Sequence, residues 1–209
     1  MPNVDEAHAH THEKHGSLVV EDNVGNLEGQ IIIDALQSLL IARGLLTAPE
    51  VIKEIEKLES PGIHLGAQIV ARAWTDPEYK SSLLENGKQA IGDLGIAVGE
   101  AQIIVVENTS QVHNLITCTL CSCYPRSILG QPPSWYISKS YRARAVREPR
   151  EVLKEFGTVL PKNMDLVVHD SNADMRYLVL PECPDNVTDL NVSQLQSSVT
   201  RDRLIGVTR

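Results

Sequence analysis

The sequence predicts an α+β protein with a helical N-terminal half and a mixed C-terminal half. Up to about residue 98, apolar residues recur at helical spacing, and short breaks containing Gly or Pro divide the pattern. From Gln102 onward, runs rich in Ile and Val alternate with helical patterns and with Pro-rich segments. We therefore expect one domain over residues 29–209, helical over 29–98 and α+β over 99–209.

The first 28 residues show neither helical nor strand periodicity. They are polar and rich in His, Glu, Asn and Gly, which predicts a flexible arm over residues 1–28. A histidine cluster within this arm could chelate a divalent metal, although a solvated tail is the simpler interpretation. The cluster comprises His8, His10, His12 and His15.

Four helices are expected in the N-terminal half. The first covers residues 31–46, and the segment 47–50 (Thr-Ala-Pro-Glu) has the form of a capping box that opens a second helix through about Leu58. A third helix is expected over residues 64–74. The segment 75–78 (Thr-Asp-Pro-Glu) repeats the capping-box signature and predicts the start of a fourth helix.

The C-terminal half combines strands and helices around a rigid loop. Three prolines and a glycine exclude regular structure over residues 125–133. A helical pattern over residues 139–156 is interrupted at Pro149, and residues 108–110 (Asn-Thr-Ser) form a turn between the first two strand-like runs. The strand-like runs are 103–107, 112–117, 165–169 and 176–180, and a last helix is expected over 191–204.

Composition and charge exclude several classes of protein. A formal charge of −8 and the lack of a basic patch interleaved with aromatics argue against nucleic acids and anionic membranes as partners. No apolar run reaches the roughly 20 residues that a membrane span needs. The first residues carry no secretory signal and the four cysteines are too few for a disulfide scaffold, so we expect a cytoplasmic protein. Aromatics make up only 4%, so aliphatic packing must form the core.

Three of the four cysteines lie within residues 118–123, which read Cys-Thr-Leu-Cys-Ser-Cys. If the thiolates of Cys121 and Cys123 bind one metal, the backbone nitrogens of Ser122 and Cys123 lie between them and can close fused chelate rings in one plane once deprotonated. Cys118 is near enough in the chain to cap that plane from one side. The opposite position then stays open to water or substrate, which distinguishes a catalytic metal site from a structural one.

The donor set indicates the kind of metal. Thiolates and anionic amide nitrogens are strong donors that favour a trivalent low-spin ion over zinc, and soft sulfur ligands exclude magnesium and calcium. Structural zinc takes four ligands, typically from two separated pairs, whereas this chain has one cluster. An iron–sulfur cluster needs a fourth cysteine, but Cys183 lies in a Pro-Glu-Cys-Pro turn without cluster spacing. Three unrelated free thiols are the alternative to a metal site.

The cysteine segment and its surroundings resemble the metal-binding region of nitrile hydratase α subunits. The resemblance begins at Val112-His113-Asn114 and continues through residues 118–125. It extends over roughly residues 30–207 and implies the fold of that family, in which a layered α/β C-terminal domain carries the metal loop. Further similarity lies within residues 73–79, 128–136, 141–157 and 200–207.

The resemblance implies a role for each ligand of the loop. Cys118 would be the unmodified axial thiolate, whereas Cys121 would be oxidised to a sulfinate and Cys123 to a sulfenate. The amide nitrogens of Ser122 and Cys123 would complete the protein ligands. The metal site is therefore expected to comprise Cys118, Cys121, Ser122 and Cys123.

The same resemblance indicates cobalt. Thr119 and Tyr124 match the cobalt branch of the family, so non-corrin cobalt(III) is the expected cofactor and iron(III) is less favoured. The implied reaction is hydration of a nitrile to an amide, with the oxygen on Cys123 as nucleophile or base and with Ser122 and Tyr124 hydrogen-bonding that oxygen or water. A separate β-type subunit, which donates arginines to the cysteine oxygens, and a metallochaperone or activator are the implied partners.

Two residues depart from the family pattern. Arg126 stands where the family often has a pocket tryptophan, and Gly99 where it has a pocket glutamine. Arg126 and the following 128–131 are closer to the thiocyanate hydrolase γ subunit, so conversion of thiocyanate to carbonyl sulfide and ammonia is an alternative function. Arg126 could equally be a surface charge. A metal-binding or thiol redox-sensing protein without turnover is the non-enzymatic alternative.

Basic residues after the loop bear on the choice of partner. Arg176 resembles a family arginine near the subunit interface. The other arginines are spaced over more than one helix face and are expected either at an interface with a β-type subunit or in local ion pairs with neighbouring glutamates. They are Arg142, Arg144, Arg147 and Arg150.

Overall fold

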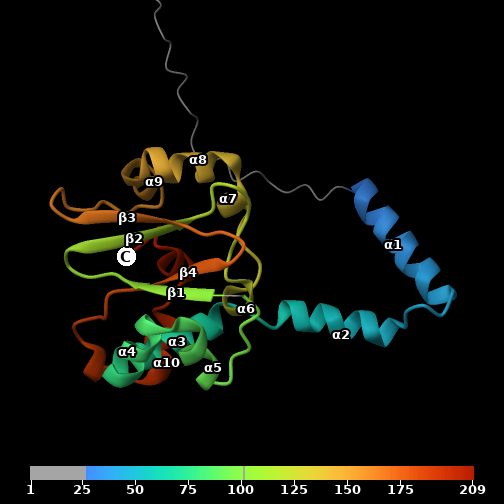
Figure 1. Cartoon of the computed structure of the whole chain (residues 1–209), viewed down its shortest axis with the longest axis horizontal. Helices are drawn as coiled ribbons and strands as arrows, with labels where there is room; N and C mark the ends of the chain where they lie inside the picture. The colour runs from blue at the N-terminus through green and yellow to red at the C-terminus, as the bar shows by residue number, and fades with distance from the viewer. Residues whose placement is uncertain (1–26, 101) are drawn as a thin grey trace, which may run out of the picture.

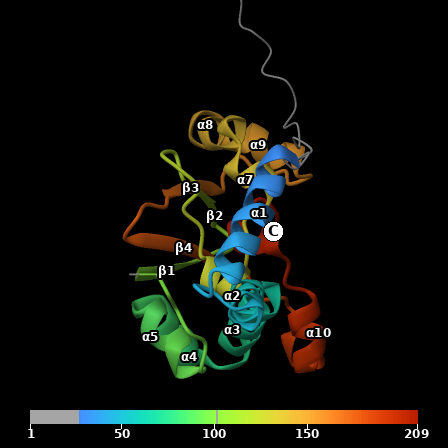
Figure 2. The same ribbon diagram turned by 90° about the vertical axis from the view of Figure 1, so that its right-hand side faces the viewer.

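The computed structural model describes residues 27–100 and 102–209, which form a body and a projecting arm (Figure 1). The arm consists of α1 (Leu27–Ala42) and α2 (Ala48–Glu59). Both helices extend away from the rest of the chain, and in the view of Figure 2 they lie in front of the body. Across the described residues, no helix combines the length and the hydropathy of a membrane-spanning segment.

The expectations for the first 28 residues fall largely on positions outside the described part of the chain. The described residues begin at Leu27, which is also the first residue of α1. The predicted histidine cluster therefore lies outside the described residues. The first predicted helix is present, but it begins and ends four residues earlier than the expected range of 31–46.

The arm exposes apolar side chains on both of its helices. In α1 the most exposed large apolar side chain, Ile32, has 66% of its surface accessible, and in α2 Ile52 has 55%. Helices of this length are only marginally stable in water without a packing partner. The arm therefore presents a surface that other protein can cover. Its exposed large apolar residues are Ile31, Ile32, Ile33, Leu36, Leu39, Leu45, Leu46, Ile52 and Ile55.

The capping box expected at the start of the second helix is confirmed. The hydroxyl oxygen of Thr47 accepts the backbone N–H of Glu50 at 3.4 Å, and the Glu50 carboxylate accepts the backbone N–H of Thr47 at 2.8 Å. This reciprocal pairing satisfies two N–H groups that the first turn of a helix leaves without partners.

The second predicted capping box is wrong by one residue. The helix that it announces is α4 (Pro77–Glu85), and its cap is Asp76, whose carboxylate accepts the N–H groups of Glu78 and Tyr79. Thr75 instead remains in α3 (Ile63–Thr75) and donates its hydroxyl to the carbonyl of Ala71 at 2.9 Å. Proline favours the first helical position, and this preference makes the residue before it the cap.

The body is layered, as the resemblance implies. Figure 1 shows α3, α4, α5 (Gly87–Asp93) and α10 (Val192–Ser197) along one side of the strands. On the other side lie α7 (Ser134–Ile137), α8 (Lys139–Arg147) and α9 (Pro149–Glu155). The C-terminal helix α11 (Arg201–Ile205) contacts both β4 (Met175–Leu180) and β2 (Val112–Thr117), which belong to different strand pairs. The predicted α+β class is confirmed.

Two parallel strand pairs form the centre of the body. β1 (Gln102–Glu107) pairs with β4, so that Gln102 lies opposite Met175. β2 pairs with β3 (Asp165–Asp170), so that Thr117 lies opposite Asp170. Although β1 and β2 follow each other after a short turn, they do not pair with each other. Each takes its partner from a strand far along the chain.

Two further expectations for the C-terminal half need correction. The proline-rich segment 125–133 is not free of regular structure, because it contains the one-turn helix α6 (Arg126–Leu129). The last predicted helix, 191–204, is divided into α10 and α11. Thr200 divides it, since its hydroxyl accepts the N–H of Arg203 at 3.3 Å and so caps a new helix. The interruption of the earlier helix at Pro149 is confirmed.

The core is mainly aliphatic, as the low aromatic content predicts. Five of the aromatic side chains gather in one cluster at α7. The ring of Trp135 lies 4.9 Å from that of Tyr141 and 4.8 Å from that of Phe156, and the ring of Tyr136 lies 5.1 Å from that of Tyr124. These pairs are edge-to-face, the arrangement that aromatic quadrupoles favour.

Gly206 lies where the C-terminal segment crosses β2. It ends α11 with a φ of 86°, and a Cβ atom at this position would lie 1.9 Å from the carbonyl oxygen of Asn114. The Gly206 carbonyl oxygen lies 2.8 Å from Nε2 of the buried His113. Only glycine allows the two backbones to come this close.

We expect G206A to lower the free energy of unfolding by about 3 kcal/mol or more, because it combines backbone strain with a clash against backbone. Gly157 is a matched control, since its φ is 80° but nothing lies within 4 Å of a Cβ atom there. G157A should therefore cost only about 1 kcal/mol. Urea denaturation followed by circular dichroism measures both losses, and equal losses would contradict the proposed close contact.

Candidate metal centre

The cysteine loop emerges from the C-terminal end of β2. Cys118 follows the last strand residue directly and is completely buried, whereas Cys121 is exposed and Cys123 is partly exposed. The sulfur of Cys121 lies 3.3 Å from that of Cys118 and 3.0 Å from that of Cys123. All three sulfurs lie within 4.8 Å of one another. The structure therefore brings together the three cysteines that the sequence predicts as ligands.

Contacts at both ends of the loop hold this arrangement. At its start, the backbone N–H and the hydroxyl of Thr119 both donate to the carboxylate of Asp170. Within it, the backbone N–H of Cys121 donates to the Cys118 sulfur at 3.2 Å. At its end, the hydroxyl of the buried Tyr136 donates to the carbonyl of Cys123 at 2.8 Å. The loop is thus fixed by residues of β3 and α7 as well as by its own backbone.

The thiols of the loop differ in their electrostatic environment. Hydrogen bonds from Cys123 and Cys118 lower the pKa of the Cys121 thiol. Burial raises the pKa of the Cys123 thiol to about 12, and the positive charge of Arg176 opposes this rise. Arg176 therefore favours negative charge at the Cys123 sulfur.

A cavity of about 450 Å³ opens beside the sulfurs. The strand pairs explain how it forms, because residues that precede β1 and β4 meet there with the loop that follows β2. Arg126 and Arg176 supply two positive charges, and neither forms an ion pair with another described residue. The Nε atom of Arg176 is buried without a hydrogen-bond partner in the described part of the chain. The lining residues are Gly99, Glu100, Cys121, Ser122, Cys123, Tyr124, Arg126, Ala173 and Arg176.

Glu100 is a cavity residue that sequence reasoning missed. Its carboxylate accepts the backbone N–H of Ser127 at 3.1 Å and also the Ser127 hydroxyl, while its carbonyl accepts the Lys88 ammonium at 2.7 Å. These bonds tie the segment before β1 to α6, which carries Arg126. No local pattern in the sequence marks Glu100, because its partner lies 27 residues away.

The expected catalytic side chains occupy different environments. Ser122 is partly exposed and lines the cavity, as Cys123 does. Tyr124 is buried, with its ring against Tyr136, and its hydroxyl forms no hydrogen bond with another described residue. Burial raises the pKa of the Tyr124 hydroxyl well above its usual range. Tyr124 therefore stays a neutral phenol, and it is also one of the residues that line the cavity.

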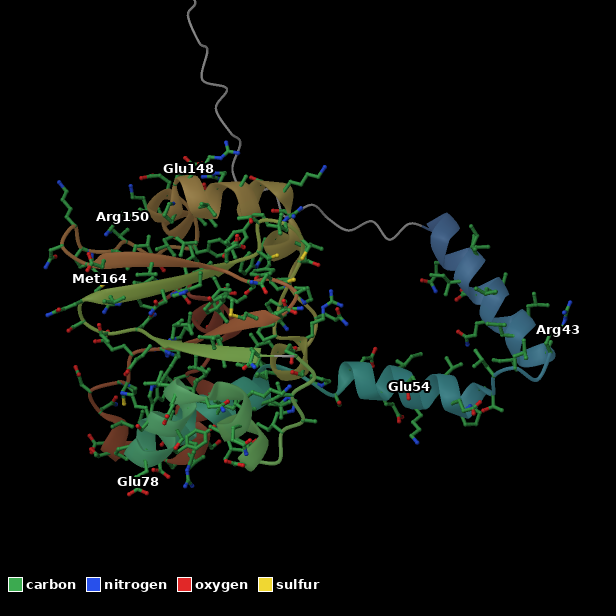
Figure 3. The ribbon with its side chains drawn as sticks, in the orientation of Figure 1. Arg43, Glu54, Glu78, Glu148, Arg150 and Met164 are labelled. Atoms are coloured by element: carbon green, nitrogen blue, oxygen red, sulfur yellow. The ribbon has the colours of Figure 1, made fainter. Side chains whose placement is uncertain are left out.

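The four arginines after the loop divide into two groups. Arg144 forms ion pairs with Glu148 and Glu155, and Arg150 donates to backbone carbonyls including that of Met164 (Figure 3). Local ion pairs with neighbouring glutamates are thus confirmed for Arg144, whereas Arg150 is bound by backbone carbonyls and forms no ion pair with another described residue. Arg142 and Arg147 instead line a second cavity of about 460 Å³, on the same face of α8 as Lys139. No described acidic residue forms an ion pair with these three cations.

The residues present fit a metal ion of the expected kind. Three sulfurs converge without any disulfide, and one is buried while two face a cavity that substrate can enter. The Arg126 and Arg176 guanidiniums suit a centre rich in anionic ligands. A soft, thiolate-preferring ion matches this donor set, whereas magnesium or calcium does not.

Comparison with known proteins identifies the family. The family model described as "Nitrile hydratase, alpha chain" matches residues 28–208. The chain belongs to the nitrile hydratase α-chain family. The resemblance seen in the cysteine loop is therefore confirmed, and it extends over nearly all of the described residues.

Individual nitrile hydratase relatives agree with this assignment. The cobalt-containing nitrile hydratase subunit alpha of Pseudonocardia thermophila is 44% identical over 178 residues, which cover 84% of this chain and 87% of the relative. The thiocyanate hydrolase subunit gamma of Thiobacillus thioparus is 38% identical over 190 residues, covering 85% of this chain and 78% of the relative.

Solved structures show the same fold. A double mutant of the Fe-type nitrile hydratase from Comamonas testosteroni Ni1 superposes with a TM-score of 0.81 at 42% identity, covering 88% of this chain and 91% of that one. A recombinant thiocyanate hydrolase with partially modified cobalt centers gives a TM-score of 0.78 at 38% identity, covering 88% and 90%. The fold is thus shared by nitrile hydratases and thiocyanate hydrolase.

Proposed function

We propose that this chain is the metal-binding subunit of a cobalt-type nitrile hydratase and that it hydrates a nitrile to the corresponding amide. The observation that carries the proposal is the convergence of the Cys118, Cys121 and Cys123 sulfurs at the edge of a cavity lined by Arg126 and Arg176. Membership of the nitrile hydratase α-chain family and cobalt-containing relatives support it.

The protein ligands would be the three sulfurs and the backbone nitrogens of Ser122 and Cys123. Bound cobalt(III) supplies Lewis acidity, which makes a nitrile carbon more electrophilic and water more acidic. In the reaction, the nitrile carbon gains the oxygen of water and the nitrogen gains two protons. The roles of the chain's residues are to bind, to orient and to move those protons.

Oxidation of two cysteines would add sulfur-bound oxygens at the edge of the cavity. We assign a sulfinate to Cys121 and a sulfenate to Cys123, whose oxygen acts as nucleophile or as base towards water. Ser122 lines the same cavity and can hydrogen-bond that oxygen or the substrate. Arg176, which favours negative charge at Cys123, holds the sulfenate in its anionic form.

Thiocyanate hydrolysis, giving carbonyl sulfide and ammonia, is the second candidate function. The cavity favours it in one respect, because Arg126 and Arg176 add positive charge that a small anion can pair with. The same metal loop serves both reactions, so the two candidates differ in the substrate and not in the centre. Comparing turnover of thiocyanate with that of a neutral aliphatic nitrile separates them.

A β-type subunit is the proposed partner. Three exposed surfaces are available to a partner. The first is the apolar arm formed by α1 and α2, and the second is the side chain of Leu120 in the cysteine loop, which is 85% exposed. The third is the cationic face of α8, formed by Lys139, Arg142 and Arg147. Exposed apolar surface of this extent is typical of protein interfaces. Of these surfaces, Leu120 belongs to the metal loop itself, and α8 contacts the loop through Arg142.

Oxygen should be added at Cys121 and Cys123 in the metallated protein and not at Cys118. The physical reason is access, since Cys118 is completely buried whereas the other two sulfurs face the cavity. Intact-mass measurement followed by peptide mapping locates the added oxygen. Three unmodified thiols in active enzyme would contradict the proposed roles of Cys121 and Cys123.

Activity should depend on cobalt. Protein produced in cobalt-supplemented medium should contain about one cobalt per chain and hydrate nitriles, whereas protein from iron-rich, cobalt-free medium should have little activity. Elemental analysis and amide formation are measured on the same samples. Full activity with iron alone would show that Thr119 and Tyr124 do not indicate the metal, and a protein without either metal would favour a thiol sensor.

The chain produced alone, with cobalt present, should be inactive or aggregate, and co-production with a β-type subunit should restore activity. We expect an interface of more than ~2,000 Å², as permanent complexes bury. Size-exclusion chromatography with light scattering and an activity assay test both points. A soluble monomer with full hydrating activity would show that the site is complete in one polypeptide.

A further inference from the structure

Thr119 is the residue of the cysteine loop with the most contacts to other elements. Its backbone N–H donates to one carboxylate oxygen of Asp170 at 2.8 Å, and its hydroxyl donates to the other at 2.6 Å. Its carbonyl oxygen accepts Nη1 of Arg142 at 3.4 Å. All three polar groups of one exposed residue are therefore bound by charged side chains from β3 and α8.

The partner of Thr119 is itself held by the sheet. Asp170 is the last residue of β3, and the register of the parallel pair places it opposite Thr117, two residues before Thr119. Its side chain therefore reaches past the end of β2 to the first residues of the loop. Hydrogen bonds to a charged acceptor are about twice as strong as neutral ones, and two on one residue also fix its orientation.

Holding Thr119 fixes its neighbours. Cys118 precedes it and is immobile in the core, so the path of the chain after Thr119 is determined by how Thr119 is oriented. Leu120 points into solvent, and Cys121 then turns back so that its N–H reaches the Cys118 sulfur. Without the two contacts to Asp170, this exposed turn would sample other conformations, as solvent-exposed loop tips do.

We propose that Asp170, supported by Arg142, is a positioning residue that holds the cysteine loop in its metal-binding conformation before the metal enters. It touches neither sulfur nor substrate and acts through Thr119 alone. Its effect is on how readily the loop accepts and keeps a metal. The inference rests on the proposed function only in taking cobalt as the metal to be bound.

Four variants of the full chain, each co-produced with a β-type subunit, separate the contacts. D170A removes both acceptors, and T119V removes only the hydroxyl while keeping nearly the same shape. D170N removes the charge but retains an oxygen for the Thr119 N–H and an amide that can donate to the hydroxyl. D165A is the matched control, because Asp165 is an exposed residue at the opposite end of the same strand.

The first readout is the rate at which a chelator removes cobalt from the metallated protein. D170A should lose cobalt on the order of tenfold faster than the wild type, since it removes two charge-assisted hydrogen bonds that solvent partly screens. The rates of cobalt loss from T119V and D170N should each lie between those of D170A and the wild type, and the rate for D165A should match that of the wild type. Wild-type rates for D170A would overturn the proposal.

The second readout needs no metal. In protein produced without cobalt, iodoacetamide should label Cys118 very slowly because that sulfur is completely buried, and D170A should raise its labelling rate several-fold relative to Cys183 in the same chain. Unchanged labelling in D170A would contradict preorganisation of the loop. If D170A does not fold, as thermal melting would show, T119V and D170N decide the question by both readouts.

The outcomes distinguish this inference from the proposed function. A wild-type chain that never binds cobalt would overturn the proposed function, while the labelling of Cys118 would still test the role of Asp170. A wild-type chain that binds cobalt and hydrates nitriles together with a β-type subunit, with D170A indistinguishable from it in both readouts, would overturn only the positioning role.

Discussion

The parallel pairing of β2 with β3 is the interaction on which the rest of the site depends. β2 delivers Cys118 into the core and β3 ends at Asp170, so the backbone hydrogen bonds of the pair fix a contact between Thr119 and Asp170, which are 51 positions apart. The chain then passes through residues 171–174 to β4, whose own parallel pairing with β1 sets Arg176 at the cavity. Parallel strands bring together segments that are distant in sequence, and here residues before β1 and β4 and the loop after β2 meet at one cavity.

The sequence predicted those features of the helices that depend on interactions between residues close together in the chain. The capping box at Thr47 and Glu50 and the interruption at Pro149 depend on residues within one helical turn, and both are present. The last predicted helix was divided because Thr200 competes as a cap, which periodicity alone does not reveal. Pairing of the strands could not be predicted, because hydrophobic runs define strands without specifying their partners.

The three cysteines whose sulfurs converge could be predicted as a candidate metal site because they lie within six consecutive residues. A chelate formed by Cys121, Ser122 and Cys123 requires no tertiary information. The residues that shape and hold the loop could not be found in the same way: Asp170 and Glu100 reach their partners across the fold, and neither belongs to a spaced motif. The role expected for Tyr124 stays a prediction, since its ring packs in the aromatic cluster while its hydroxyl forms no hydrogen bond within the described residues.

Charge explains why cations gather around the loop in a chain with a net charge of −8. Three thiolates and two deprotonated amide nitrogens would carry more negative charge than a trivalent ion neutralises. An excess of this kind in a partly buried site needs positive charge nearby, since unpaired charge is costly to bury. Arg176 and Arg126 line the cavity, and Arg142 contacts the loop from α8. Arg142 belongs to the cationic face of α8, and no described acidic residue forms an ion pair with this face. Acidic groups of a bound subunit could therefore pair with this face without competing for the arginines in the cavity.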